Sequence, residues 1–379
     1  MNFDFTEEHK LSRNAIRYFA EKEIAPLVEK AEEEEEFPLE LFPKMGKLGY
    51  LGMRYPEKYG GPGADRVTEC ICMEEIAKVC IGIASSILVQ SGLGTSAIFD
   101  FGTEGQKQTY LIPAIKGEKV CAFALTEPDA GSDAKSIKAT AKKVDNGYVI
   151  NGTKTFITNG PIADYVVVVV YTNMEKGIKG MSLFIVDKGT QGFHCERKIS
   201  KMGFRSAPVG ELVFEDCFIP EKNLIGVENE GFEKAIDTLT QGRMLHAARS
   251  VGLARAAFDA AVKYSKQRVQ FGKPIVKFQA IRFMLAEMAM EIDAAELLAY
   301  RAAWLNDQKR NCAKEAAMAK LFAGEMVVRI TNRALQIHGG YGYTRELPIE
   351  RYYRDAKLCT ISEGTSEIQH VVIARELGL

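Results

Sequence analysis

The run Tyr165-Val166-Val167-Val168-Val169-Val170-Tyr171 predicts a buried β-strand near the middle of the chain. An apolar, β-branched run of this kind is typical of a strand covered on both faces, and it is far too short to cross a bilayer. Further strands are predicted at residues 181–186 and 211–214 and around Asp145-Asn146-Gly147, a hairpin-turn sequence. Together these segments predict a β region over residues 121–229.

Helical periodicity predominates on both sides of this region. The order helix, strand, helix predicts an α+β protein with domains at residues 1–120, 121–229 and 230–379. No GxGxxG motif follows a strand, so a doubly wound nucleotide-binding domain is not expected. The clearest helical stripe recurs at steps of three and four and consists of Ile281, Met284, Leu285, Met288, Ile292, Ala295 and Leu298.

Composition excludes several classes of protein. The 379 residues are 46% hydrophobic and 26% charged, as in a soluble globular protein, and the net charge of −1 argues against a general nucleic-acid partner. The eight cysteines form no CxxC pair, so no metal site is expected, and their scatter fits reduced thiols in a cytoplasmic protein. The acidic N-terminus has no apolar core, so neither a signal peptide nor a membrane association is expected.

Glu363 is the strongest candidate for a catalytic residue. It precedes Gly364, which permits a sharp turn, and then Thr365 and Ser366, which can cap a following helix. A carboxylate at such a bend can point into a cavity and remove a proton from carbon. The alternative is an exposed carboxylate stabilised by the helix dipole.

Two segments of the predicted β region could hold a ligand. Residues 124–133 place hydroxyls, Gly131 and acids around a tight turn, which could grip a phosphate or a heteroaromatic edge or could be a plain Asx turn. Residues 151–160 carry Phe156 and Thr158 on one strand face, a platform for a planar ring, although an ordinary amphipathic strand has the same pattern.

Two further segments lie in the C-terminal helical region. In residues 268–279, Arg268 could clamp a phosphate, or it could be a surface residue at a helix end. In residues 336–343, three glycines let the backbone pass close to a bulky ligand. His338 has no acid or cysteine within sequence reach and is interpreted as structural.

Taken in this order, the segments resemble the acyl-CoA dehydrogenase family over essentially the whole chain. Residues 124–136 and 336–355 match two family signatures, with residues 156–160 between them. The resemblance implies an N-terminal helical domain, a middle β-barrel-like domain and a C-terminal four-helix bundle. It also implies an FAD cofactor, an acyl-CoA substrate and a place in fatty acid metabolism.

The resemblance also implies roles for individual residues. Thr126 and Thr158 would bond the flavin ring, and Phe156 would pack on it. Residues 268–279 and 336–340 would contact the pyrophosphate and adenosine, in part from a neighbouring subunit, which implies a homotetramer. Arg243 matches a residue near the adenine end of CoA. The cofactor-binding residues are Phe123, Leu125, Thr126, Ser132, Phe156, Thr158, Arg268, Gln270, Phe271, Phe278, Gln279, Gln336, Gly339, Gly340, Thr365 and Glu367, and the substrate-binding residues are Ser132, Arg243, Ser362 and Gly364.

By the same resemblance, Glu363 would take the α-proton of the thioester while the β-hydride moves to flavin N5. Electrons would pass to electron-transfer flavoprotein. Some members carry the base at the position of Gly242, which cannot abstract a proton.

The substrate is expected to be a short-chain acyl-CoA, as for butyryl-CoA dehydrogenase. Ser362 stands where straight-chain members often have Tyr, which predicts tolerance of a branched or cyclic acyl group. Ala84 stands where glutaryl-CoA members carry an Arg, which argues against a dicarboxylic substrate. The alternatives are a flavin oxidase or nitroalkane-type relative of the same fold, an enoyl-CoA reductase working in reverse, and a helical binding protein that has lost its chemistry.

Overall fold

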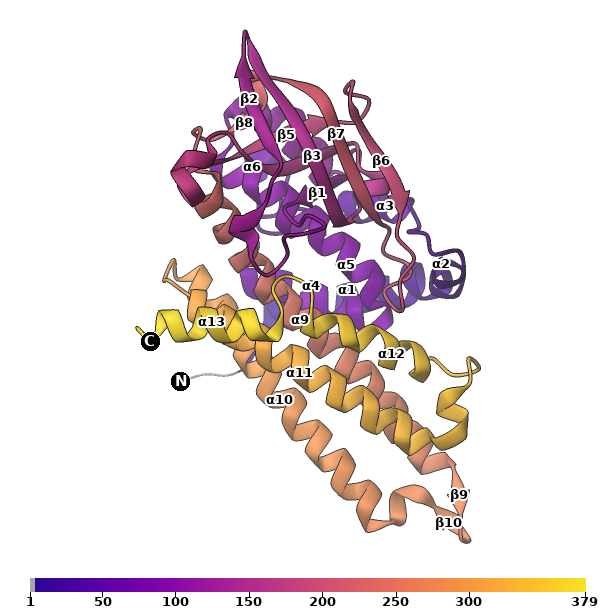
Figure 1. Cartoon of the computed structure of the whole chain (residues 1–379). Helices are drawn as coiled ribbons and strands as arrows, with labels where there is room; N and C mark the ends of the chain where they lie inside the picture. Colours follow the sequence, from indigo (N-terminus) through magenta and orange to yellow (C-terminus); the bar gives the residue numbers. More distant parts are fainter. Residues whose placement is uncertain (1–3) are drawn as a thin grey trace.

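The computed structural model describes residues 4–379 (Figure 1). Along the chain, one helical region precedes the strands of the sheet and a second helical region follows them. Side-chain caps start several helices of the first region; the Asp65 carboxylate, for example, accepts a hydrogen bond from the Thr68 backbone amide where α4 begins. The helices of this region are α1 (Glu7–Phe19), α2 (Val28–Glu34), α3 (Leu41–Lys47), α4 (Arg66–Val79), α5 (Ile81–Leu88), α6 (Thr95–Phe101), α7 (Glu104–Gln106) and α8 (Ile112–Ile115).

The β region forms one mixed sheet with the order β6-β7-β3-β2-β4-β5-β8, and β1 pairs in parallel with β4. No pairing joins β6 to β8 in the described chain, so the curved sheet is open rather than a closed barrel. The strands are β1 (Cys121–Ala124), β2 (Thr140–Val144), β3 (Gly147–Thr158), β4 (Tyr165–Tyr171), β5 (Met181–Asp187), β6 (Phe193–Lys198), β7 (Val209–Pro220) and β8 (Leu224–Ile225).

Strand β4 has the bounds that its sequence predicts, and every one of its residues is buried. Its side chains alternate between two hydrophobic cores, as the pleat requires. Tyr165, Val167 and Val169 belong to the large core shared with the helices, and Val166, Val168 and Val170 belong to a smaller core within the β region. An uninterrupted apolar run is therefore needed because both faces of the strand are covered.

The C-terminal region is built on three long helices that pack against one another, with two shorter helices crossing them (Figure 1). A two-stranded hairpin joins the first two long helices at the end far from the sheet. The elements are α9 (Gly231–Gln267), β9 (Val269–Gln270), β10 (Lys273–Pro274), α10 (Gln279–Asp307), α11 (Ala313–His338), α12 (Ile349–Ala356) and α13 (Ser366–Glu376). The predicted α+β class and the three-part arrangement of the fold are confirmed.

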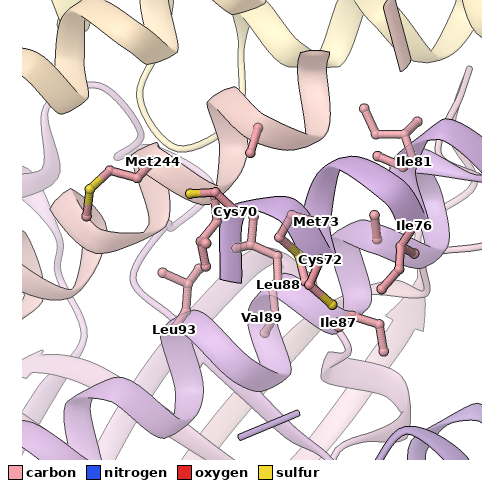
Figure 2. Close-up of a cluster of buried hydrophobic side chains, with 14 of the residues drawn as sticks. Cys70, Cys72, Met73, Ile76, Ile81, Ile87, Leu88, Val89, Leu93 and Met244 are labelled. Atoms are coloured by element: carbon pink, nitrogen blue, oxygen red, sulfur yellow. The ribbon is translucent and has the colours of Figure 1, made fainter. Parts of the chain in front are cut away.

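A shared core fixes α9 against the N-terminal helices. Figure 2 shows Cys70 and Met73 of α4, Leu88 of α5, and Met244 of α9 in this core, together with Leu93. The helical stretch Ile81–Phe101 is long and apolar enough to cross a membrane by length and composition, but its apolar window is buried inside the protein. It therefore serves as part of the core that holds the middle of α9 in place.

Candidate active site

Glu363 lies in a short turn between α12 and α13, with a left-handed backbone (φ 57°), and Gly364 continues the turn at φ 90°. A left-handed conformation strains any residue other than glycine and persists only where its surroundings impose it. Here the buried Lys320 ammonium donates to the Gly364 carbonyl at 2.6 Å, and the Gln369 amide donates to the same carbonyl at 2.9 Å. Thr365 caps α13 by accepting a hydrogen bond from the Ile368 amide, as its position predicts.

The Glu363 side chain points into the protein and is only 11% exposed. Its Oε2 atom is buried and has no hydrogen-bond partner in residues 4–379, and its Oε1 atom lies 3.6 Å from Nη2 of Arg249. Gly242 of α9 lies directly opposite, since a Cβ atom there would be 2.6 Å from Oε2. The alternative of an exposed, dipole-stabilised carboxylate is therefore wrong, and the glycine at 242 leaves room for the carboxylate.

Burial sets the electrostatics of this carboxylate. Desolvation raises the pKa of Glu363 above its usual range, while the charges of Arg249, Lys320 and Arg243 act in the opposite direction. Burial also lowers the pKa of Lys320 to about 8, although Glu363 opposes that shift. A buried carboxylate with a raised pKa and a free oxygen is suited to accept a proton from carbon.

The residues expected beside a flavin ring lie on β1, on β3 and in the loop that follows β1. The Thr155 amide donates to the Thr126 carbonyl at 2.9 Å, which ties this loop to β3. A bulge between Lys154 and Ile157 leaves Phe156 at φ 57° with 65% of its surface exposed. An aromatic ring held outward in a strained conformation fits the packing of a planar cofactor, and Thr158, the last residue of β3, is half-buried.

A buried ion pair supports the same loop. The Lys154 ammonium donates to Glu127 at 2.8 Å, and Glu127 also accepts from the amides of Lys138 and Ala139. Burial lowers the pKa of Lys154 to about 8, and Glu127 acts against this shift. The ion pair therefore anchors the loop to β3 at one end of the segment that the resemblance assigns to flavin and substrate. Ser132, at the tip of the loop, is exposed.

A second group of predicted cofactor residues lies at the far end of α9. Arg268, Gln270, Gly339 and Gly340 line a cavity of about 520 Å³, and a Cβ atom at either glycine would meet only open space. Phe271, on the hairpin beside this cavity, is 92% exposed. The three remaining members of the group, Phe278, Gln279 and Gln336, lie at adjacent helix ends. His338 bonds the Ala334 carbonyl and stacks on Tyr264, which is the structural role predicted for it.

The two groups cannot contact the same dinucleotide within one chain. Gly242 adjoins Glu363, whereas Arg268 follows the end of α9, so at ~1.5 Å per residue the helix separates the groups by roughly 37 Å. The structure thus places the base against the middle of α9 and the predicted ring-binding residues on the β region. It leaves the predicted adenosine and pyrophosphate residues at the other end of the helical region (Figure 1).

The other predicted site residues are distributed around the base. Arg243 is buried on α9 near enough to lower the pKa of Glu363, and its Nη1 atom lies 3.4 Å from the Thr240 hydroxyl. Ser362 contacts His246 and Arg249 through its hydroxyl. Glu367 is exposed at the start of α13, and Phe123 and Leu125 line the β1 end of the loop.

Sequence reasoning missed Arg249, His246 and Lys320, all of which are buried around Glu363. A signal for the first two was available. Positions 242, 246 and 249 follow helical spacing, and two of them place polar side chains in an otherwise alanine-rich buried stretch of α9. Lys320, on α11, had no such signal because its partner is a backbone carbonyl in a distant segment.

Comparisons with known proteins agree with this geometry. The chain matches the acyl-CoA dehydrogenase N-terminal domain over residues 6–118, the middle domain over residues 122–217 and the C-terminal domain over residues 229–378. It is 45% identical to the caffeyl-CoA reductase-Etf complex subunit CarC of Acetobacterium woodii, with 98% of each chain covered.

Solved structures give the same result. Butyryl-CoA dehydrogenase from Megasphaera elsdenii superposes with a TM-score of 0.98 at 42% identity and covers both chains completely. An FAD complex of PigA superposes with a TM-score of 0.97 at 31% identity, again over both whole chains. The chain belongs to the acyl-CoA dehydrogenase family.

Proposed function

We propose that this protein is an FAD-dependent enzyme that introduces a double bond between the α- and β-carbons of a short-chain acyl-CoA, with Glu363 as the base. The observation that carries the proposal is the buried Oε2 atom of Glu363, which is held at a strained turn and has no hydrogen-bond partner among the residues that the structure describes. Membership of the acyl-CoA dehydrogenase family and the likeness to butyryl-CoA dehydrogenase support the reaction and the short acyl chain.

The residues of the site fit FAD. Thr126, Thr158 and the outward-facing Phe156 would hold the flavin ring, and the residues around Arg268 and Gly340 would hold the pyrophosphate and adenosine. When bound, FAD supplies the acceptor for the two electrons that leave the substrate as a β-hydride. We propose electron-transfer flavoprotein as the electron-accepting partner, because one relative is a subunit of a reductase-Etf complex.

The chain's own residues perform the proton transfer. Glu363, as a carboxylate, accepts the α-proton that the thioester carbonyl acidifies. Its burial raises its basicity and excludes water from the reacting carbons. The bonds from Lys320 and Gln369 to the Gly364 carbonyl keep the turn, and therefore the carboxylate, in one position during the reaction.

Anaerobic titration of the purified protein with straight, branched and cyclic acyl-CoA thioesters tests this function. Short acyl thioesters should bleach the flavin absorbance. Comparison of oxygen uptake with dye reduction then separates a dehydrogenase from an oxidase. A colourless protein that binds no FAD, or a flavin that none of the thioesters bleaches, would refute the proposal.

The reverse direction is a second candidate function. Three relatives between 45% and 46% identical carry the names of reductases that act on aryl or short unsaturated acids or thioesters. The same Glu363 would then give a proton to the α-carbon of an enoyl-CoA. Reoxidation of the reduced protein by crotonyl-CoA, measured against oxidation of butyryl-CoA, decides which direction is favoured.

The pH dependence should reveal the charges around the base. Because only the ionised carboxylate accepts a proton, kcat/KM should fall as the pH decreases through the raised pKa of Glu363. Lys320→Gln removes a positive charge that favours the carboxylate, so this acid limb should move to higher pH. The shift should be confined to pH below about 8, where Lys320 is charged. Lys357→Gln replaces an exposed lysine near the same turn and should leave the acid limb of the kcat/KM profile in place. An acid limb that does not move in Lys320→Gln would show that Lys320 does not influence the ionisation of Glu363.

We further propose a homotetramer in which each FAD contacts two subunits, in a cytoplasmic protein of fatty acid metabolism. The separation of the two cofactor groups along α9 supports shared sites. An apolar stripe at every seventh position of α10, each residue at least half exposed, supports helix association: Phe283, Met290, Leu297 and Trp304. The eight free cysteines fit a reducing compartment.

Mixed assemblies test the shared sites. If Arg268 of one subunit holds the FAD of the neighbouring subunit's site, Arg268→Glu should abolish FAD binding in that neighbouring site. Glu363→Gln should abolish proton transfer in its own site. Each variant alone should therefore be inactive. Co-expression of the two should restore activity, because some sites then combine an intact Glu363 with an intact Arg268 from the neighbour. Failure to restore activity in co-purified mixed assemblies would argue that each site belongs to one chain.

A further inference from the structure

Buried positive charge exceeds buried negative charge around the base. Arg249, Lys320 and Arg243 are each at most 5% exposed, and all three lower the pKa of the single carboxylate of Glu363. A guanidinium keeps its charge in any protein environment, so neither arginine can escape its burial by losing a proton. A buried charge without a partner of opposite sign is costly, and this arrangement therefore favours a second anion.

Arg249 is the cation that lies within ion-pair distance of the base, and neutral groups accept its hydrogen bonds. Its Nη1 donates to the Ser85 hydroxyl at 2.7 Å, and its Nη2 donates to the Ser362 hydroxyl at 3.3 Å. Its Nε is buried and has no hydrogen-bond partner in residues 4–379. The carboxylate of Glu363, at 3.6 Å, lies beyond hydrogen-bond distance. Arg249 is only 2% exposed, yet its bonded partners are neutral hydroxyl groups.

His246 adds a second unused polar group at the same place. Its Nε2 lies 3.2 Å from the Ser362 hydroxyl, and its Nδ1 is buried with no partner in the described chain. Burial lowers the pKa of His246, so the ring is neutral and can present an N–H donor. Ser362, His246 and Arg249 therefore form one polar surface beside the base.

Glu363 cannot be both the counter-ion of Arg249 and an effective base. A close pair with a guanidinium would stabilise the carboxylate and weaken it as a proton acceptor. During the reaction the carboxylate must face the α-carbon instead, which leaves Arg249 without an anion. The anion that replaces it has to arrive with the substrate.

We propose that Arg249, with Ser85, His246 and Ser362, binds a carboxylate at the far end of the acyl group, so that the substrate is the CoA monothioester of a short dicarboxylic acid. This inference rests on the proposed function, since it assumes that Glu363 attacks the α-carbon of a bound acyl-CoA. The short gap between Glu363 and Arg249 limits the acyl group to a few carbons, and glutaryl-CoA is the suitable probe. The expectation against a dicarboxylic substrate came from Ala84 alone, whereas this arginine comes from another helix and bonds the neighbouring Ser85.

Ligand binding without turnover tests the subsite. In a Glu363→Gln background, the holoprotein should bind glutaryl-CoA more tightly than valeryl-CoA, which has the same number of acyl carbons and no terminal charge. The expected ratio of dissociation constants is roughly 10- to 100-fold, the usual value of a hydrogen bond between charged groups. Adding Arg249→Gln should abolish the preference, and adding Arg249→Lys should retain part of it.

Two further variants separate the subsite from general effects on α9. Ser85→Ala should weaken glutaryl-CoA binding modestly, because Arg249 loses the hydroxyl that orients it. Arg255→Gln removes another partly buried arginine of α9, one paired with Glu74 and Glu296, and should lower stability without changing the glutaryl-to-valeryl ratio.

The outcomes distinguish this inference from the proposed function. Equal affinity for the two thioesters, or a preference for glutaryl-CoA that persists in Arg249→Gln, would overturn the carboxylate subsite. In that case, bleaching of the wild-type flavin by valeryl-CoA would still support the proposed dehydrogenase function. If the wild-type flavin responds to neither thioester and neither binds, the proposed function itself is wrong.

Discussion

Replacing Glu363 by Gln is expected to lower the rate of substrate-dependent flavin bleaching by about 10²- to 10⁴-fold, the usual contribution of a general base. The amide has nearly the same shape but cannot accept the α-proton. FAD should remain bound, because the predicted ring-binding residues lie on other elements. Stopped-flow absorbance of the anaerobic holoprotein mixed with butyryl-CoA measures this rate.

Glu376→Gln is the matched control for this variant. Glu376 is also in the C-terminal segment but pairs with Arg375 and is not among the charges that shift the pKa of Glu363, so its replacement should leave the bleaching rate unchanged. Retained bleaching in Glu363→Gln, with flavin content equal to that of the wild type, would place the base elsewhere in the protein.

Gly242→Ala should lower the reaction rate nearly as much, although it adds only a methyl group and leaves Glu363 itself unchanged. The new Cβ would lie 2.6 Å from Oε2 of Glu363 and 2.8 Å from Cδ2 of Leu93, so the carboxylate must move. A displacement of about 1 Å in a reacting group can cost about 10²-fold in rate, and a loss of this order is expected in kcat. Steady-state dye reduction with butyryl-CoA measures it.

Thermal unfolding of the same samples shows whether the Gly242→Ala protein is folded. Gly105→Ala is a suitable control, because a Cβ at residue 105 would come no closer than 3.9 Å to a neighbouring atom. Should Gly242→Ala retain the wild-type kcat, the carboxylate could not occupy the position that the structure gives it.

The fold could be predicted where a short stretch of sequence indicates by itself which of its residues are buried. The valine run has to be covered on both faces, and the bounds of β4 follow directly from it. The turn sequence at Asn146 likewise gave the hairpin of β2 and β3. The strand order of the sheet could not be predicted in the same way, because it depends on pairing between distant strands that no local pattern encodes.

The site could be predicted only in part, for a similar reason. Glu363 could be singled out because the residues that shape its turn are adjacent in sequence. Arg249 and Lys320 act on it from α9 and α11, and their contacts exist only once these helices pack around the turn. The separation of the two cofactor groups is also a property of the length and position of α9 rather than of any motif.

Hydrogen exchange at the α-carbon of acetyl-CoA tests the central claim most directly, because this thioester has α-protons but no β-carbon and so isolates the proton transfer. Proton NMR in deuterium oxide would follow the loss of the methyl signal in the presence of the holoprotein. We predict exchange that depends on the wild-type protein and disappears in Glu363→Gln. Exchange at equal rates in the two proteins, or none in either, would contradict the assignment of Glu363 as the base.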